Sequence, residues 1–153
     1  MTTTESETST LRAIPADECR RLLTTRRIGR LGVVVEHFPL VIPVNYTLDG
    51  EVVVLRMASG TTLAALHHAN VSFEVDVIDE RTRSGWSVLV RGLAEELTPQ
   101  HRAELVARTQ AADPQPWAPG ERGHWVRLIP QGITGRRIVP GQLPPAFEAA
   151  GYL

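Results

Sequence analysis

Runs of apolar and β-branched residues, separated by short polar turns, predict strands over most of this chain. Residues 71–77 alternate strictly between apolar and polar positions, which is typical of a strand buried on one face. Residues 86–97 continue this character over a greater length, with a β-bulge expected at Gly92. The Asp49-Gly50 pair lies between two apolar runs and predicts a hairpin turn. Further strands are expected at residues 31–35, 40–46, 52–55, 125–129 and 133–139.

Three segments have helical character. Residues 11–27 are expected to form a helix, because Pro15 suits the first turn, acidic residues follow it and arginines end the segment. Shorter helices are expected at residues 61–69 and 99–110. Strands joined mostly by hairpins, with three short helices, predict a mainly β fold, an antiparallel barrel of six or seven strands.

Pro43 interrupts the predicted strand at residues 40–46. Because proline cannot donate a ladder hydrogen bond, its presence indicates an edge strand, a bulge or a strand that faces a ligand at this point. The chain shows neither a strand-helix-strand rhythm nor a GxGxxG motif. A doubly wound dinucleotide-binding sheet is therefore not expected.

The length of 153 residues, 42% of them apolar, fits one domain. Polar residues 1–10 are expected to form a disordered tail, residues 11–140 the domain, and residues 141–153 a C-terminal tail that lies over a surface or a partner subunit. A single cysteine, Cys19, excludes an internal disulfide, and it is expected to be a small buried side chain. The first residues lack the apolar stretch of a signal peptide, and no apolar run is long enough for a membrane span, so a cytoplasmic location is expected.

Charge excludes several function classes. Sixteen basic and seventeen acidic residues are interspersed and leave a net charge of −1, which argues against a general nucleic-acid-binding protein. All the basic residues are arginine, so lysine Schiff-base chemistry is excluded. No metal site is expected, because His67 and His68 are adjacent and on a helix would point about 100° apart.

The segment from Arg56 to Thr62 passes from a predicted strand to a predicted helix. The hydroxyl groups of Ser59, Thr61 and Thr62 and the free N–H groups at the helix start suit a phosphate, and Arg56 can add a bidentate contact. The same residues also fit an ordinary helix cap beside a solvated arginine, and taken alone they favour this second interpretation.

Trp125 and Arg127 are two positions apart on a predicted strand and share one face. An aromatic surface beside a guanidinium can hold a flat, electron-poor ring. The alternative is that Trp125 fills core or interface space and Arg127 stacks on it.

The order of motifs along the chain resembles that of the pyridoxamine 5′-phosphate oxidase-like flavin proteins, in the branch that contains nitroimidazole-resistance proteins. The resemblance spans residues 14–138. It rests on Gly29-Arg-Leu-Gly32, Ile42-Pro-Val-Asn-Tyr46, Asp49-Gly50, Ser59-Gly60, Val71-Ser-Phe-Glu-Val-Asp76, Gly85-Trp-Ser-Val-Leu-Val-Arg-Gly92 and His124-Trp-Val-Arg-Leu128.

This resemblance implies a split β-barrel homodimer that binds FMN at the subunit interface. It assigns the flavin ring to Pro43, Val44, Asn45, Tyr46 and Ser87, the phosphate to Arg56, Met57, Ala58, Ser59, Gly60, Thr61, Thr62 and Leu63, and a contribution from the other subunit to Trp125 and Arg127. The implied activity is that of an oxidoreductase, in which reduced flavin gives hydride or electrons to a small planar acceptor.

One position departs from the family pattern. Relatives often carry a lysine where this chain has Thr62, and Arg56 is expected to compensate with its own charge. Similar proteins use the deazaflavin F420 or bind haem, so an F420-dependent reductase and a non-catalytic flavin- or haem-binding protein are alternatives. Catalytic residues stay unassigned, since Tyr46, His124 or solvent can protonate a product.

Overall fold

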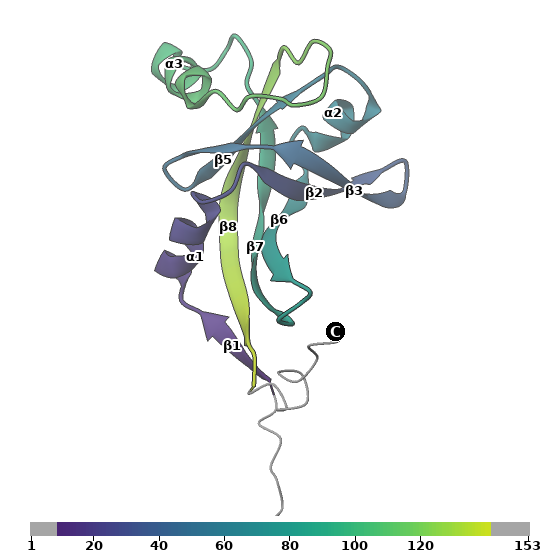
Figure 1. Ribbon diagram of the computed structural model, residues 1–153. Helices are drawn as coiled ribbons and strands as arrows, with labels where there is room; N and C mark the ends of the chain where they lie inside the picture. Colours follow the sequence, from purple (N-terminus) through teal and green to yellow (C-terminus); the bar gives the residue numbers. More distant parts are fainter. Residues whose placement is uncertain (1–8, 142–153) are drawn as a thin grey trace, which may run out of the picture.

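In the computed structural model, which describes residues 9–141, eight strands form one antiparallel sheet in the order β3-β2-β6-β7-β8-β5-β4, with β1 paired to β8 (Figure 1). The strands are β1 (Thr10–Ile14), β2 (Ile28–Val35), β3 (Phe38–Asn45), β4 (Thr47–Asp49), β5 (Val52–Met57), β6 (Asn70–Asp79), β7 (Ser84–Glu96) and β8 (His124–Val139). The helices are α1 (Ala16–Leu23), α2 (Thr61–Leu66) and α3 (Ala103–Ala112). The predicted mainly β, antiparallel split-barrel class is confirmed.

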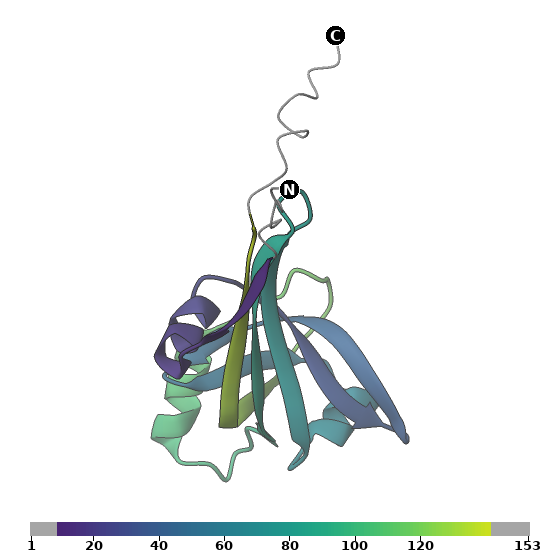
Figure 2. The same cartoon turned by 90° about the horizontal axis from the view of Figure 1, so that it is seen from below.

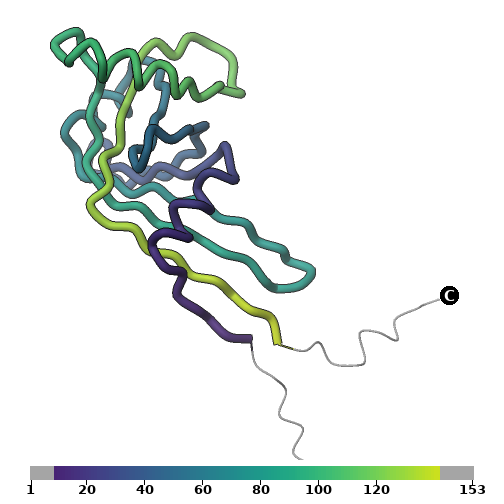
Figure 3. Tube along the Cα trace, turned by 90° about the vertical axis from the view of Figure 1, so that its left-hand side faces the viewer, coloured from purple at the N-terminus to yellow at the C-terminus, as the bar shows by residue number. Residues whose placement is uncertain are grey.

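Strand β8 has two different partners on its outer edge. Its first part pairs with β5, from Met57 opposite His124 onward, and its last part pairs with β1. Figure 3 shows β1 and the end of β8 side by side, where they extend beyond the rest of the fold together with the hairpin of β6 and β7. The strand therefore belongs both to the curled part of the sheet and to its flat extension.

A bulge separates these two parts of β8. Arg91 pairs with Gly132, whereas its neighbour Gly92 pairs with Pro130, so Gln131 is the extra residue. A bulge bends a strand and increases its twist, which curls the sheet at this point. The irregularity predicted at Gly92 is confirmed, although the inserted residue belongs to β8.

The concave face of the sheet holds the core. Leu31, Phe73 and Leu128 are fully buried there, and α1 packs against β8 with the buried Cys19. Figure 2 shows α1 and α3 at one side of the molecule and α2, next to the β2 and β3 hairpin, at the other. Tyr46, which follows β3, is also part of the core: it is 1% exposed, and its ring packs edge to face on that of Phe73, with 5.0 Å between the ring centroids.

On the opposite face of the sheet, no element of residues 9–141 covers the strands. The strand register places on it exposed apolar side chains from five adjacent strands, namely Val34, Val41, Ile78, Leu89 and Ile138. Charged residues share this face, since Arg30 lies 3.6 Å from Glu74 and 3.3 Å from Asp76. Burial, together with the hydrogen bond and charge of Asp76, raises the pKa of Glu74 to about 7.

The helix predicted over residues 11–27 is shorter than expected, and this prediction was wrong at both ends. Residues Thr10–Ile14 form β1, and only Ala16–Leu23 is helical. Ile14 precedes a proline, which disfavours the helical region for that residue, and β8 satisfies the backbone groups of the whole segment. Pro15 is the residue before the helix, with φ −59° and ψ 152°.

Other boundaries also moved. The strands expected at residues 125–129 and 133–139 are one strand, β8, because a bulge rather than a turn lies between them. The helix expected at 99–110 is α3, and that expected at 61–69 ends at Leu66. Pro43 lies in β3, and β3 is an edge strand of the sheet. An edge strand was one of the three interpretations that the sequence left open for this proline. The Asp49-Gly50 hairpin is present between β4 and β5.

The two predicted tails lie outside the described residues, apart from positions 9, 10 and 141, and Thr10 begins β1. Within the described range, no helix has the length and apolar character needed to cross a membrane.

Replacing Gly92 by alanine is expected to lower the free energy of unfolding by about 3 kcal/mol. A Cβ atom at this position would lie 2.2 Å from the carbonyl oxygen of Ile129, so backbone would have to move. Urea denaturation measures the effect. Gly132→Ala is the matched control at the same bulge, because its nearest contact is the side chain of Arg91 at 3.8 Å. Equal stability of the two variants would contradict this prediction.

Candidate functional site

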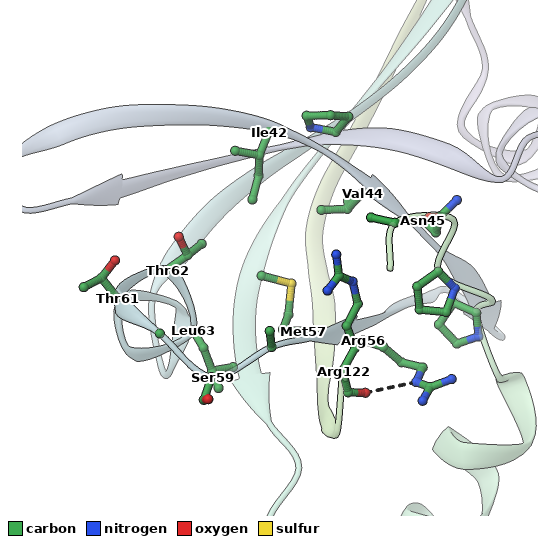
Figure 4. A pocket seen from close by; sticks show the side chains of 16 residues that line it. Ile42, Val44, Asn45, Arg56, Met57, Ser59, Thr61, Thr62, Leu63 and Arg122 are labelled. Carbon is green, nitrogen blue, oxygen red and sulfur yellow. Dashed lines mark hydrogen bonds between the residues drawn. The ribbon is translucent and has the colours of Figure 1, made fainter. Parts of the chain in front are cut away.

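A cavity of about 360 Å³ opens between β3, the end of β5, the start of α2 and the loop of residues 113–123 (Figure 4). It is lined by Ile42, Pro43, Val44, Asn45, Arg56, Met57, Ala58, Ser59, Gly60, Thr61, Thr62, Leu63, Pro114, Pro116, Ala118 and Arg122. Three segments that are distant in the sequence, residues 42–45, 56–63 and 114–122, thus meet at one place.

Apolar side chains form one wall of the cavity. Ile42 and Val44 alternate along β3 and lie together in Figure 4, with Met57 of β5 below them. Leu63 is 6% exposed and fixes α2 against the core. This wall suits a flat, apolar group.

Hydroxyl groups occupy one end of the cavity. Ser59, Thr61 and Thr62 lie at the start of α2, apart from the arginines (Figure 4). The residue before the helix is Gly60, whose φ of 156° and ψ of −172° are a conformation that essentially only glycine adopts. No side chain caps the helix, so the interpretation of Ser59 or Thr61 as an ordinary cap is wrong.

Two arginines occupy the other end. Arg56 donates from Nε to the carbonyl oxygen of Arg122 at 3.2 Å, and its Nη1 lies 3.4 Å from Oδ1 of Asp113. The guanidinium carbon also lies 4.9 Å from the centroid of the Trp125 ring, a cation–π arrangement. Arg122 forms no ion pair with any carboxylate in residues 9–141. This end of the cavity is therefore positively charged.

The loop that closes the cavity is tied to β3 by one side chain. Asn45 accepts a hydrogen bond from the backbone N–H of Trp117 at 2.9 Å and donates to the carbonyl oxygen of Arg27 at 3.5 Å. Asn45 itself lines the cavity. The wall formed by the loop is thereby fixed relative to the wall formed by β3.

A buried arginine holds α3, which precedes this loop. Nη1 of Arg127 lies 2.8 Å from Oδ2 of Asp49 and 2.7 Å from the hydroxyl oxygen of Thr109 in α3. Arg108 of the same helix reaches Asp49 from the outside at 3.0 Å. Burial by itself raises the pKa of Asp49, but the hydrogen bonds and charges of the two arginines outweigh it and lower that pKa.

Eleven of the fifteen predicted cofactor-binding residues line the cavity, and four do not. Tyr46 is buried beneath it, where its hydroxyl group donates to the carbonyl oxygen of Leu23. Ser87 lies on the uncovered face of the sheet, paired with Asp76. Trp125 and Arg127 take part in separate contacts, because Arg56 rather than Arg127 stacks on Trp125. A contribution of these two residues to a partner's site stays a prediction.

Five lining residues were not identified from the sequence: Ile42, Pro114, Pro116, Ala118 and Arg122. The last four belong to the loop of residues 113–123, which contains three prolines. No periodicity in a loop shows which side chains face a cavity, so the sequence held no indication of their role.

The two candidate proton donors differ in their surroundings. Burial raises the pKa of Tyr46 to about 12, which makes its phenol a poor proton donor. His124 lies outside the cavity lining, with Nδ1 2.7 Å from Oε1 of Glu96. In the described part of the chain no group of three His, Cys, Asp or Glu residues is placed to hold a metal ion.

Comparison with known proteins gives consistent matches. The family model described as "Pyridoxamine 5'-phosphate oxidase" matches residues 15–137. The uncharacterized protein Rv0080 of Mycobacterium tuberculosis is 35% identical over 135 residues, which cover 84% of this chain and 86% of that protein.

Solved structures are similar over most of the chain. The FAD binding protein from Mycobacterium smegmatis is 38% identical with a TM-score of 0.69, covering 82% of this chain and 98% of that chain. A FAD-binding protein from Mesorhizobium loti is 25% identical with a TM-score of 0.67, covering 86% of this chain and 98% of that chain.

Asp49→Asn is expected to lower the free energy of unfolding at pH 7 by about 2 kcal/mol, because it removes the charge that Arg127 needs. The folded pKa of Asp49 lies below its ordinary value of 3.8, so its stabilising contribution is present above that pH and is lost as the pH falls through the folded pKa. Denaturant unfolding at several pH values measures this.

The difference between the wild type and Asp49→Asn should therefore shrink below pH 3.8. Arg108→Ala is the control, since this side chain is 65% exposed and its ion pair contributes less than about 1 kcal/mol. A difference that persists unchanged at low pH would contradict the assignment of the effect to the charge of Asp49.

Proposed function

This chain belongs to the pyridoxamine 5'-phosphate oxidase family, and on that premise we propose that it is a flavin-dependent oxidoreductase whose cavity binds the mononucleotide part of the flavin. The observation that carries the proposal is the meeting of an apolar wall, three hydroxyl groups and two arginines in one cavity. The proteins in the two similar structures are FAD-binding, which supports a flavin rather than an unrelated ligand.

The residues of the cavity fit a flavin mononucleotide group. Ile42 and Val44 offer an apolar surface for the ring, and Asn45 at the end of β3 offers polar atoms for its edge. The phosphate would be held at the arginine end of the cavity by Arg56, and the hydroxyl groups at the start of α2 would bind other polar atoms of the ligand at the opposite end. Asp113 is the one carboxylate among the described residues that pairs with that guanidinium, and this carboxylate is 51% exposed. Arg56 therefore retains charge for a phosphate where relatives often use a lysine.

When bound, the flavin would supply hydride or electron transfer to a small planar acceptor. The chain itself orients the ring along β3, holds the phosphate and excludes water from the apolar wall. Among the described lining residues there is no His, Asp, Glu, Cys or Tyr. We therefore assign no general acid to the protein and let water supply the proton that a reduced product takes up.

Titration of the purified full-length chain with FMN, F420 and haem, followed by visible absorption, is expected to show saturable binding of FMN. Arg56→Ala should weaken that binding about tenfold or more, because it removes a charge-assisted hydrogen bond to the phosphate. In Arg56→Ala, the rate of turnover with a reduced nicotinamide donor and small planar acceptors should fall in proportion to the fraction of the protein that holds FMN.

The control is Arg81→Ala, which removes an exposed arginine from the turn between β6 and β7. Thermal unfolding of both variants tests that folding is retained. Saturable binding of F420 alone, a Soret band with haem alone, or binding of none of the three would refute the flavin proposal. Unchanged FMN affinity in Arg56→Ala would refute the phosphate site.

We also propose that the chain is a homodimer built on the uncovered face of the sheet. Exposed apolar residues from five strands lie on this face, and large uncovered patches of this kind mark interaction surfaces. Arg30 is close to Glu74 and Asp76 there, so the face carries both signs of charge. A second copy related by a two-fold axis presents the same residues and can match each charge with its opposite. Ser87 lies on this face and would approach the site only in such an assembly.

Leu89→Arg is expected to convert the dimer to a monomer. Leu89 is 37% exposed near the middle of β7, and burial of a guanidinium there against a second sheet would leave a charge without a partner. Light scattering coupled to size-exclusion chromatography measures the mass. Gln110→Arg is the control, because Gln110 is exposed and polar and lies on α3, outside this face of the sheet. A monomeric wild type, or a dimeric Leu89→Arg variant, would count against this interface.

A further inference from the structure

A second cavity lies at the bulge of β8. Its volume is about 140 Å³, and it opens between α1, the turn that joins β4 to β5, β7 and the bulge. It is lined by Arg20, Leu23, Leu48, Gly50, Glu51, Val90, Pro130, Gln131, Gly132 and Ile133. None of these residues lines the cavity proposed for the flavin, so the two sites are separate.

This bulge cavity lies at a gap on the outer edge of β8. On that edge β5 pairs with residues 124–128 and β1 with residues 135–139, so no strand of the described chain pairs there with residues 129–134. The inserted Gln131 also has no partner in β7. Backbone N–H and C=O groups at such an unpaired edge are available to a ligand.

Apolar side chains from four elements form the inside of the bulge cavity. Leu23 of α1 is 3% exposed and Val90 of β7 is 1% exposed, whereas Leu48 of β4 and Ile133 of β8 are half-buried. An apolar cavity of about 150 Å³ is large enough to bind benzene. The bulge cavity therefore has the size and the lining for one six-membered aromatic ring.

An ion pair forms the exposed side of the bulge cavity. Nε of Arg20 lies 2.8 Å from Oε1 of Glu51, and the two side chains are 46% and 61% exposed. Arg20 belongs to α1, which packs against β8, whereas Glu51 follows Gly50 in the hairpin turn. Since an exposed ion pair contributes little, the more exposed carboxylate can turn toward water and leave Arg20 to an anionic ligand.

We propose that the bulge cavity binds a small aromatic carboxylate, with its ring against Leu23 and Val90 and its carboxylate at Arg20. A single guanidinium offers the paired N–H groups that match one carboxylate. The described lining has no His, Cys, Ser, Tyr or Asp side chain, so this is a binding site and not a second catalytic one. The proposal does not rest on the flavin function, because the two cavities share no residue.

Nuclear magnetic resonance of the isotope-labelled full-length protein, titrated with benzoate, tests the proposal. The backbone amides of Gly50 and Gly132, which line the bulge cavity, are expected to shift and to reach saturation. The amide of Gly60, which lines the other cavity, should stay in place. Acetate lacks the ring and benzylammonium carries the opposite charge, so neither should produce a saturable shift at Gly50 and Gly132.

Two substitutions should change the affinity for benzoate in opposite directions. Arg20→Ala is expected to weaken binding about fivefold, because the carboxylate loses its charged partner. Glu51→Gln is expected to strengthen binding about twofold, because the competing charge is removed. Arg21→Ala is the matched control, since this neighbouring arginine is 63% exposed, pairs with Glu18 and does not line the cavity. Thermal unfolding of the three variants tests that the fold is retained.

Several results would overturn the proposal: no saturable shift at Gly50 and Gly132, equal shifts with acetate, tighter binding of benzylammonium, or unchanged benzoate affinity in Arg20→Ala. Shifts confined to Gly60 would place benzoate in the other cavity and would overturn it as well. Weaker binding in Glu51→Gln would contradict the exchange of one carboxylate for another. Failure of the wild type to bind FMN would refute the flavin function alone and leave this site standing.

Discussion

The extra residue Gln131 in β8 governs how the rest of this sheet is arranged. Side chains of a strand alternate between its faces, and one inserted residue exchanges the two sets. Before the bulge the even-numbered positions Val126 and Leu128 are buried in the core, whereas beyond it Gly135 is buried and Thr134 is exposed. One strand can thereby complete the curled part of the sheet with β5 and then continue flat beside β1.

The position of the cavity follows from this arrangement. The first part of β8 brings Trp125 opposite Arg56 of β5, which places that arginine over an aromatic ring at the end of its strand. Two residues farther along β8, Arg127 reaches Asp49 at the β4 to β5 turn and Thr109 in α3. These contacts fix α3 at this end of the sheet. The loop that follows α3 runs beside the edge strand β3, where Trp117 bonds to Asn45, before the chain enters β8.

Most of the fold could be predicted from the sequence, because apolar alternation and the Asp49-Gly50 turn are local properties of a strand and its hairpin. The failures arose where a distant partner decided the structure. Residues Thr10–Ile14 are exposed apart from Ile14, and they are extended because β8 pairs with them. In the same way, an arginine in a strand gives no sign of which carboxylate it will meet, so the contact of Arg127 with Asp49 could not be predicted. The loop residues Trp117 and Arg122 could not be placed at all before the path of the chain was known.

Arginine supplies every fixed positive charge in this protein, so the distribution of carboxylates decides what each one can do. Arg127 is 5% exposed and has Asp49 at 2.8 Å, and moving that carboxylate away would leave a buried charge without a partner. Arg56 has Asp113 at 3.4 Å, and that carboxylate is half exposed, so water can replace it at little cost. An anionic ligand can therefore displace Asp113 but not Asp49. The difference lies in burial, since both side chains of the Arg127–Asp49 pair are less exposed than those of the Arg56–Asp113 pair. It separates a cation that holds the fold together from one that remains available for binding.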